Sequence, residues 1–236
     1  MKFHVIPKNV LQNVFQCEKG AVDAYVRLDC WGEGSCFFHS VCLLVVSGNQ
    51  IENGKQITYT LDVPNPAFRT FQVPLLTPHL KSFPENFRQV GVMLRKKLSE
   101  ELARTPSLWK QFLRTNPINL NRTDKAMQSV HETITELAQV DVWADIWTIR
   151  YCAWRLRLNI LFVNPDSQHE PIYCGVENFT NGPKTLFIYW SNKTHFEPIV
   201  KCIANSNAQR TFGQDHHFIK CLAGQYKRGC PLDPIQ

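Results

Sequence analysis

Residues 32–46 read Gly-Glu-Gly-Ser-Cys-Phe-Phe-His-Ser-Val-Cys-Leu-Leu-Val-Val. From position 37 onward this stretch is apolar almost throughout, which predicts a helix that is buried on all sides. The two glycines before it allow the backbone to turn sharply into the helix. The stretch therefore predicts a central helix that is entered through a tight turn, with Cys36 at its start.

Cys36 stands where a thiol could act as a nucleophile. The thiolate is the attacking species, and the dipole and free N–H groups of a helix N-terminus favour it. The preceding loop, Glu33, Gly34 and Ser35, offers N–H groups that could bind an oxyanion. A buried structural cysteine at a helix start is the alternative, and the spacing alone does not decide between the two.

A second polar group of side chains lies far along the chain, where residues 194–199 read Thr-His-Phe-Glu-Pro-Ile. His195 follows a polar loop that could place an imidazole at the rim of a cleft as a general base. If the segment is a strand, the side chain of Glu197 leaves the same face and could accept the other ring N–H. Asp29 and Glu33 are rival carboxylates for that role, and an edge-strand histidine beside a solvated glutamate is the alternative.

Periodicity predicts helices in the first part of the chain and strands in the last. Helices are expected at 88–104, 107–112, 125–139 and 142–158, and strands at 159–163, 172–174, 185–190 and 195–200. Residues 5–16 fit either a short helix or a strand. This order predicts an α+β domain with a small, mainly antiparallel sheet flanked by helices.

Composition limits the class of protein. Hydrophobic residues make up 44% and charged residues 19%, which is ordinary for a core-forming globular chain. No signal-peptide pattern and no membrane-spanning apolar run is found. The nine cysteines are an odd number, which favours reduced thiols in an intracellular compartment. The net charge of +6 is dispersed and predicts solubility rather than nucleic-acid binding.

Four blocks of sequence resemble the OTU (ovarian tumour) family of cysteine proteases. Residues 33–40, Glu-Gly-Ser-Cys-Phe-Phe-His-Ser, resemble that family's Asp-Gly-Asn-Cys-Leu-Phe block. Residues 91–113 are similar to its helix with an arginine in the first turn and a following Trp/Tyr-x-x-Phe pair. Residues 143–161 are similar to its Trp-Gly-Asp helix leading into an Asn-Ile strand, and 194–197 to its His-aromatic-acid block. The four blocks occur in the family's order and cover roughly residues 25–200.

The chain departs from the family pattern at four positions within these blocks. Glu33 replaces an aspartate, Ser35 an asparagine, and Ala144 a glycine. Glu197 stands where aspartate or asparagine is more common.

The resemblance implies a papain-related fold and a deubiquitinase that cuts after the C-terminal Gly-Gly of ubiquitin. It implies Cys36, His195 and Glu197 as the catalytic residues, with a thioester on the cysteine and with no metal or cofactor. Expected partners are ubiquitin or polyubiquitin chains and ubiquitin-like modifiers. We expect a monomer with no membrane association, in the cytoplasm, or in the host cytoplasm or virion if the source is viral.

The resemblance also implies a narrow channel for the ubiquitin tail. Trp143 and Phe196 are the expected walls of the channel, and Asp145 or Asp141 is expected to pair with an arginine of the tail. Core packing is the alternative for Trp143.

The expected domain organisation is an OTU-like catalytic domain at 1–200 and a C-terminal extension at 201–236. Residues 47–85 are rich in Gly, Asn, Pro and Thr, and they predict an irregular insertion with a hairpin around 56–63. The insertion is a candidate for holding the ubiquitin body. The extension contains cysteines and histidines, but its spacing matches no standard zinc site, so no metal is expected.

Two functions from other classes remain open. One is a module of the same fold that recognises ubiquitin without cleaving it. The other is a basic structural or nucleic-acid-associated viral protein, which would bind polyanions with a steep salt dependence.

Overall fold

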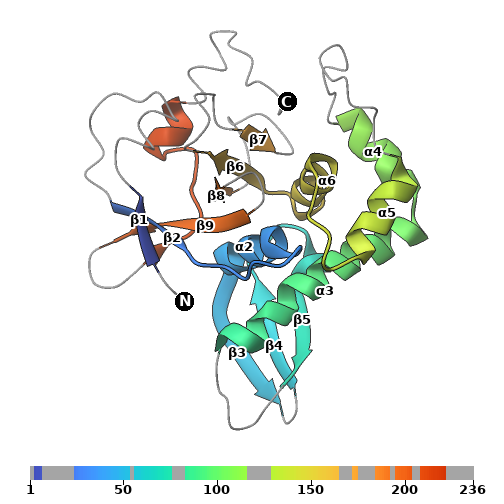
Figure 1. Cartoon of the computed structure of the whole chain (residues 1–236), viewed down its shortest axis with the longest axis horizontal. Helices are drawn as coiled ribbons and strands as arrows, with labels where there is room; N and C mark the ends of the chain where they lie inside the picture. Colours follow the sequence, from blue (N-terminus) through green and yellow to red (C-terminus); the bar gives the residue numbers. More distant parts are fainter. Residues whose placement is uncertain are drawn as a thin grey trace.

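The apolar helix behind Cys36 lies at the centre of the molecule. It is α2, Cys36–Val45, and all ten of its residues are buried. In the computed structural model, which describes residues 3–6, 24–53, 56–75, 83–115, 129–164, 172–174, 184–191, 195–203 and 208–221, this helix separates two sheets (Figure 1). The larger sheet lies on one side of α2, and the smaller sheet with a long helix lies on the other.

The larger sheet is assembled from both ends of the chain. Its strands are β1 (Phe3–Ile6), β2 (Ala24–Leu28), β6 (Asn159–Val163), β7 (Ile172–Cys174), β8 (Thr185–Ser191), β9 (His195–Cys202) and β10 (Ala208–Gln209). The order is β1-β2-β9-β8-β6-β7, with β10 also paired to β9. Among the pairs described, β6 and β8 run parallel and the others antiparallel. The predicted α+β class with a mainly antiparallel sheet is confirmed.

The smaller sheet replaces the irregular insertion expected at 47–85. It consists of β3 (Val46–Asn53), β4 (Gln56–Leu61) and β5 (Thr70–Pro74), in that order and antiparallel. Burial alternates along β4 and β5, as expected for strands with one face on the core. The prediction of irregular structure was therefore wrong for β3, β4 and β5, and the hairpin expected around 56–63 is instead the single strand β4, paired with β3 and β5. A 3-10 turn at Pro66–Phe68 connects β4 to β5.

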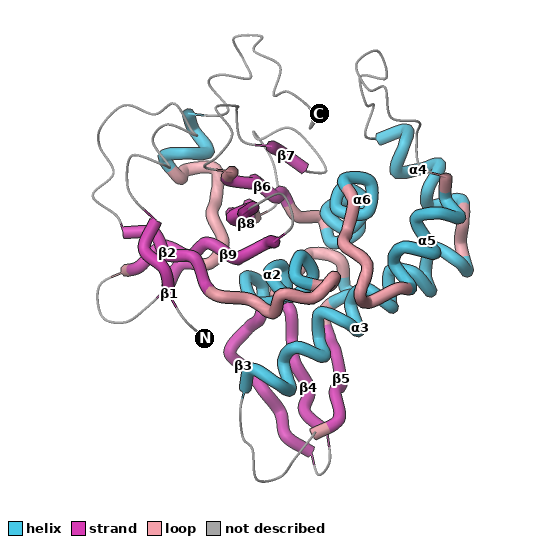
Figure 2. The backbone as a smooth tube through the Cα atoms, in the orientation of Figure 1, coloured by secondary structure: helices cyan, strands magenta, loops and turns pink. Residues whose placement is uncertain are grey.

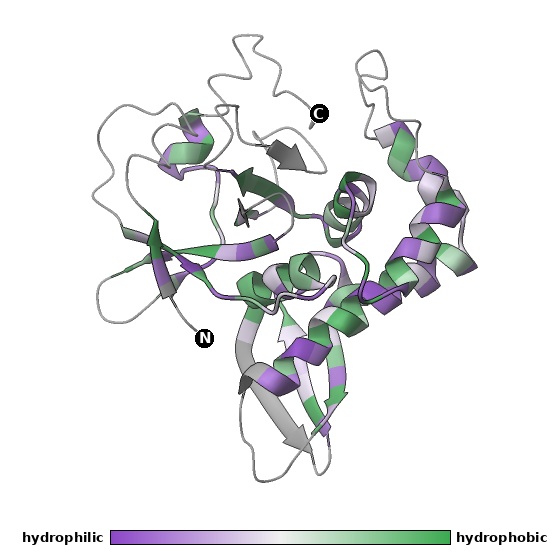
Figure 3. Ribbon diagram, viewed as in Figure 1, coloured by the Kyte–Doolittle hydropathy of each residue, from purple (hydrophilic) through white to green (hydrophobic). Residues whose placement is uncertain are grey.

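Four further helices follow where periodicity placed them. They are α3 (Phe83–Arg104), α4 (Ser107–Thr115), α5 (Val130–Ala138) and α6 (Ile146–Leu156). The helix predicted at 142–158 is confirmed as α6, and most of its residues are buried. The alternation of polar and apolar surface on α3 can be followed in Figure 3. None of the described helices combines the length and apolarity needed to span a membrane.

Part of the C-terminal segment packs on the larger sheet. Phe212 stacks on Phe187 of β8 with ring centroids 4.3 Å apart, and the hydroxyl of Tyr25 lies 2.9 Å from Nε2 of His216. A short helical turn follows at 217–221. Cys221 is disulfide-bonded, so the expectation that every thiol is reduced was wrong for this residue.

Candidate active site

The loop before Cys36 is held by a buried arginine. Arg95 of α3 has no exposed surface, and its Nη1 donates to the carbonyl of Gly34 at 3.1 Å. It also donates to two carbonyls in the last turn of α5, Glu136 at 2.5 Å and Leu137 at 3.2 Å, and to two in the α5–α6 connection, Val140 at 3.4 Å and Val142 at 2.6 Å. One guanidinium therefore joins two loops that are remote in sequence, and Figure 2 shows both loops beside α3.

Gly34 is required by close packing of these two loops. A Cβ atom at this position would overlap the backbone C and O of Asp141 and lie 2.6 Å from the backbone N of Val142. Gly32 has open space around it instead. The glycine turn predicted from the sequence thus has one sterically constrained position and one open position.

The thiol of Cys36 lies at the junction of α2 and β9. The backbone N–H groups of Phe196 and Phe37 face it, and the hydroxyl of Ser40, one turn further along α2, donates to the carbonyl of Phe196 at 3.0 Å. Burial raises the pKa of Cys36 to about 11, and these N–H groups and the charge of Arg95 lower it only in part. In this state the thiol is neutral at pH 7, so activation needs a base.

His195 begins β9 and adjoins a buried carboxylate. Its Nε2 lies 3.6 Å from Oε1 of Glu197, an ion-pair distance longer than a hydrogen bond. The other oxygen of Glu197, Oε2, lies 3.0 Å from Nη1 of Arg27 on the neighbouring strand β2. The same-face placement predicted for His195 and Glu197 is consistent with this geometry.

The rival carboxylates occupy different positions. Glu33 pairs with Arg88, whose Nε donates to its Oε2 at 3.1 Å, so this carboxylate is engaged elsewhere. Asp29 is exposed and remains close to the imidazole. Potential ligand atoms of Asp29, His195 and Glu197 all lie within 4.8 Å of one another, and they form the one such group among the residues that the structure places. Two carboxylates and an imidazole could hold a divalent cation, but the same donors can also orient a catalytic histidine.

The expected substrate-binding residues lie in three different environments. Trp143 is 41% exposed and lies with the exposed Val140 and Val142 on the α5–α6 connection. Asp145 is the N-cap of α6 and accepts from the N–H of Thr148 at 2.8 Å, while burial raises its pKa.

Phe196 lies in the core rather than on a channel wall. Its side chain is 5% exposed and contacts the rings of Phe37, Phe162 and Trp190. What it presents to Cys36 is its backbone.

His39, one turn after Cys36, lies in the core. It is buried with its ring edge-on to Trp31 at 5.1 Å, and burial lowers its pKa to about 4. It therefore stays neutral at pH 7.

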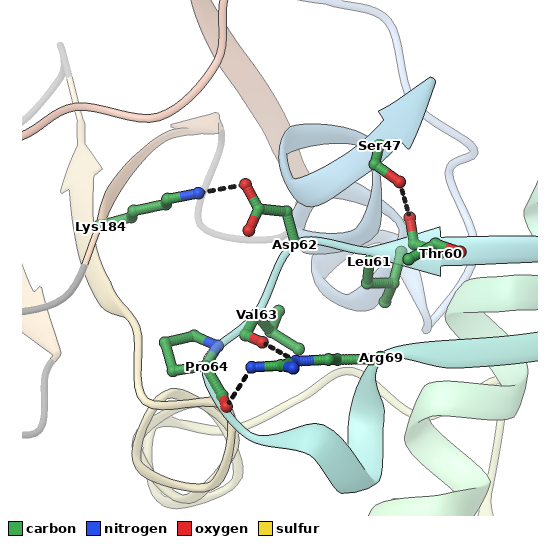
Figure 4. A pocket seen from close by; sticks show the side chains of 8 residues that line it. All are labelled: Ser47, Thr60, Leu61, Asp62, Val63, Pro64, Arg69 and Lys184. Carbon is green, nitrogen blue, oxygen red and sulfur yellow. Dashed lines mark hydrogen bonds and ion pairs between the residues drawn. The ribbon is translucent and has the colours of Figure 1, made fainter. Parts of the chain in front are cut away.

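A hollow of about 430 Å³ lies between the end of β4 and Lys184 (Figure 4). Its cationic groups already have partners. Lys184 pairs with Asp62, and Arg69 donates to the carbonyls of Val63 and Pro64. This hollow carries no residue of the candidate active site.

Sequence reasoning missed two residues of this site. Arg95 lies in the helix predicted at 88–104 directly before Lys96 and Lys97, and its local sequence does not distinguish it from these lysines. Arg27 gave no signal, because its contact with Glu197 depends on the long-range pairing of β2 with β9.

Neither a family model nor a curated protein matches the chain. Several solved structures are similar to it. For an ovarian tumour (OTU) domain in complex with ubiquitin, the TM-score is 0.45 at 10% identity, covering 88% of this chain and 90% of that chain. For an OTU deubiquitinase from Wolbachia pipientis wMel bound to ubiquitin, the TM-score is 0.40 at 14% identity, with 80% and 98% covered.

A third similar structure is the viral OTU domain protease from Taggert virus. Its TM-score is 0.39 at 9% identity, covering 89% of this chain and 98% of that chain. The solved structures to which the chain is similar are thus OTU domains, the family that its four sequence blocks resemble.

Proposed function

We propose that the chain is a cysteine-dependent deubiquitinase that hydrolyses the isopeptide bond after the C-terminal Gly-Gly of ubiquitin. The observation that carries the proposal is the junction of α2 and β9. There the thiol of Cys36 faces the N–H of Phe196, while His195 and Glu197 flank that residue on the same strand. The substrate class is supported by the four sequence blocks that resemble OTU proteases, and from this substrate we infer an activity inside cells.

In the proposed reaction His195 first takes the proton of Cys36. Because Nε2 of His195 is directed at Glu197, Nδ1 is the ring nitrogen left for the thiol. The sulfur attacks the carbonyl carbon of the last glycine, and the C–N bond to the lysine amine breaks as His195 returns the proton to that amine. Water, deprotonated by His195, then hydrolyses the thioester and frees Cys36.

The oxyanion of the tetrahedral intermediate needs N–H donors from the loop before Cys36. The amide of Cys36 already donates to the carbonyl of Glu33 at 2.9 Å. The carbonyl of Gly34 is directed at Arg95, so in the trans peptide the N–H of Ser35 points away from that side chain. We assign Ser35 N–H as the principal donor, and the exposed Trp143 as a wall for the ubiquitin tail.

One observation favours the second function, recognition of ubiquitin without cleavage. Cys36 has no exposed surface, and burial raises its thiol pKa to about 11. Catalysis thus requires the substrate to displace the groups that cover the thiol, whereas binding alone does not.

Covalent labelling by ubiquitin with a C-terminal electrophile tests the proposal. We expect a mass increase of one ubiquitin in the parent, no labelling of Cys36→Ala, and full labelling of Cys202→Ala, which removes an exposed free thiol. Binding of ubiquitin without labelling between pH 6 and 9, in protein shown to be folded, would favour the second function. Labelling that disappears in Cys202→Ala would place the reactive thiol elsewhere.

A further inference from the structure

Arg27 is a charged residue next to the candidate site to which the proposed mechanism gives no role. It lies on β2, which pairs antiparallel with β9, and its position is opposite Ile199. Glu197 lies two residues from Ile199 on the same strand, so both side chains leave the same face of the sheet. Arg27 and Glu197 are therefore diagonal neighbours across the β2–β9 pair, and Nη1 of Arg27 lies 3.0 Å from Oε2 of Glu197.

The environment of Glu197 makes this contact necessary. Residues 196–200 are all buried, and Glu197 itself is 6% exposed. A buried carboxylate without a counter-charge is strongly unfavourable in free energy. Asp29, whose carboxylate lies in the same group, is itself an acid and cannot supply that charge. His195 is charged only when it is protonated, so among the described residues Arg27 is the permanent cation at ion-pair distance from Glu197.

The position of Arg27 is itself fixed by a third strand. Its guanidinium lies over the ring of Tyr189 on β8, with its central carbon 4.7 Å from the ring centroid. Tyr189 is directly opposite Glu197 in the β8–β9 pair. Side chains from three adjacent strands therefore stack in one row across the sheet, and the ring limits where the guanidinium can move.

We propose that Arg27 is a positioning residue of the proposed reaction. It holds Glu197 by one oxygen, Oε2, and thereby leaves Oε1 directed at Nε2 of His195. The imidazole is in turn held with Nδ1 available to Cys36. This inference rests on the proposed function for its catalytic meaning, but the contact network is independent of the substrate.

The test compares Arg27→Met with the parent in labelling by the ubiquitin electrophile. Arg27→Met is expected to lower the maximal rate of labelling by at least about 10-fold, with no change in the concentration for half-maximal rate. Arg27→Lys keeps the charge without the planar fork and is expected to recover part of the rate. Arg155→Met, which removes a comparable partly buried arginine from its pair with Glu101, is the control and should label like the parent.

A double-mutant cycle separates positioning from a general loss of stability. In the Glu197→Gln background a neutral amide replaces the carboxylate, so Arg27→Met should have no further effect on the rate of labelling. That double variant also leaves no unpaired buried charge, so it should fold even if Arg27→Met alone does not. The proposal is overturned if Arg27→Met labels at the parent rate. It is also overturned if the rate loss of the double variant equals the product of the losses of the two single variants.

A second readout keeps the two proposals distinguishable. If the parent is not labelled by the ubiquitin electrophile, the proposed function fails. The rate at which iodoacetamide alkylates Cys36 at pH 7, followed by peptide mass mapping, is then compared between the parent and the variants. Slower alkylation in both Arg27→Met and Glu197→Gln than in the parent would still support the positioning role, and equal rates in all three would overturn it.

Discussion

Of the two glycines in the turn before the central helix, Gly34 is required by close packing, whereas Gly32 is not. Both precede Cys36, but only at Gly34 would a Cβ overlap the backbone of Asp141. Backbone atoms cannot move aside as the end of a long side chain can, so the α5–α6 connection would be pushed from the loop before Cys36.

We expect Gly34→Ala to lower the free energy of unfolding by ~1–3 kcal/mol and to reduce labelling of Cys36. Gly32→Ala, the matched control, should change stability by less than ~0.5 kcal/mol. Urea unfolding of both variants measures the difference. Equal effects of the two substitutions would mean that the loop is not as closely packed as Gly34 indicates.

Cys36, His195 and Glu197 could be proposed from the sequence because each lies in a short block whose residue types carry its chemistry. The neutral state of the Cys36 thiol could not be predicted in this way. A helix start favours the thiolate, but burial outweighs it and raises the pKa to about 11. Burial depends on the assembled fold, so the local sequence indicates the effect of the helix start on the thiol pKa but not the effect of burial.

Helix α3 is fastened to the rest of the site by Arg95. Its guanidinium donates to carbonyls on both the loop before Cys36 and the α5–α6 connection. Burial lowers the pKa of Arg95, although the charges of Glu136 and Asp141 raise it. Loss of this side chain would leave the buried carbonyls of Gly34 and Leu137, and three partly buried ones, without this donor.

Arg95→Met is therefore expected to lower the free energy of unfolding by at least ~3 kcal/mol. Lys96→Met, on the exposed next position of the same helix, is the control and should be close to neutral. Thermal or urea unfolding measures both. If Arg95→Met were as stable as Lys96→Met, water or a rearranged loop must satisfy those carbonyls.

Helices and strands were predicted correctly where one hydrophobic repeat dominates the segment. The 3.6-residue repeat of α6 and the apolar run of β6 were both recognised, because their burial pattern is continuous in sequence. The segment 47–85 was misjudged because its Gly, Asn, Pro and Thr content concealed alternation at Ile57, Tyr59 and Leu61, which are buried on one face of β4. Its partners β3 and β5 supply the pairing that composition alone does not reveal.

The stability of the whole domain should depend on pH through His39. Its pKa is lowered from 6.5 to about 4 by burial and by the charge of Arg95. Between these values the unfolded chain binds a proton that the folded chain does not. The stabilisation is therefore complete above pH 6.5 and decreases as the pH falls towards 4, by up to about 3 kcal/mol.

Urea unfolding at pH 7, 6 and 5 measures this slope. His39→Gln should be less stable at pH 7 but show a shallower loss towards pH 5, where few carboxylates are yet protonated. His131→Gln removes an exposed histidine and should keep the parent slope. A parent slope that is unchanged in His39→Gln would mean that another group carries the pH dependence.

The pairing of β2 with β9 has a consequence for how the protein is made. β2 ends at Leu28 and its partner begins at His195, so the sheet behind α2 cannot close until most of the chain has left the ribosome. The nascent chain would hold Cys36 and its apolar helix without the strand that covers them. Reactivity at Cys36 would thus appear only after β9 has been synthesised and has paired with β2, and until then chaperones could bind the exposed helix.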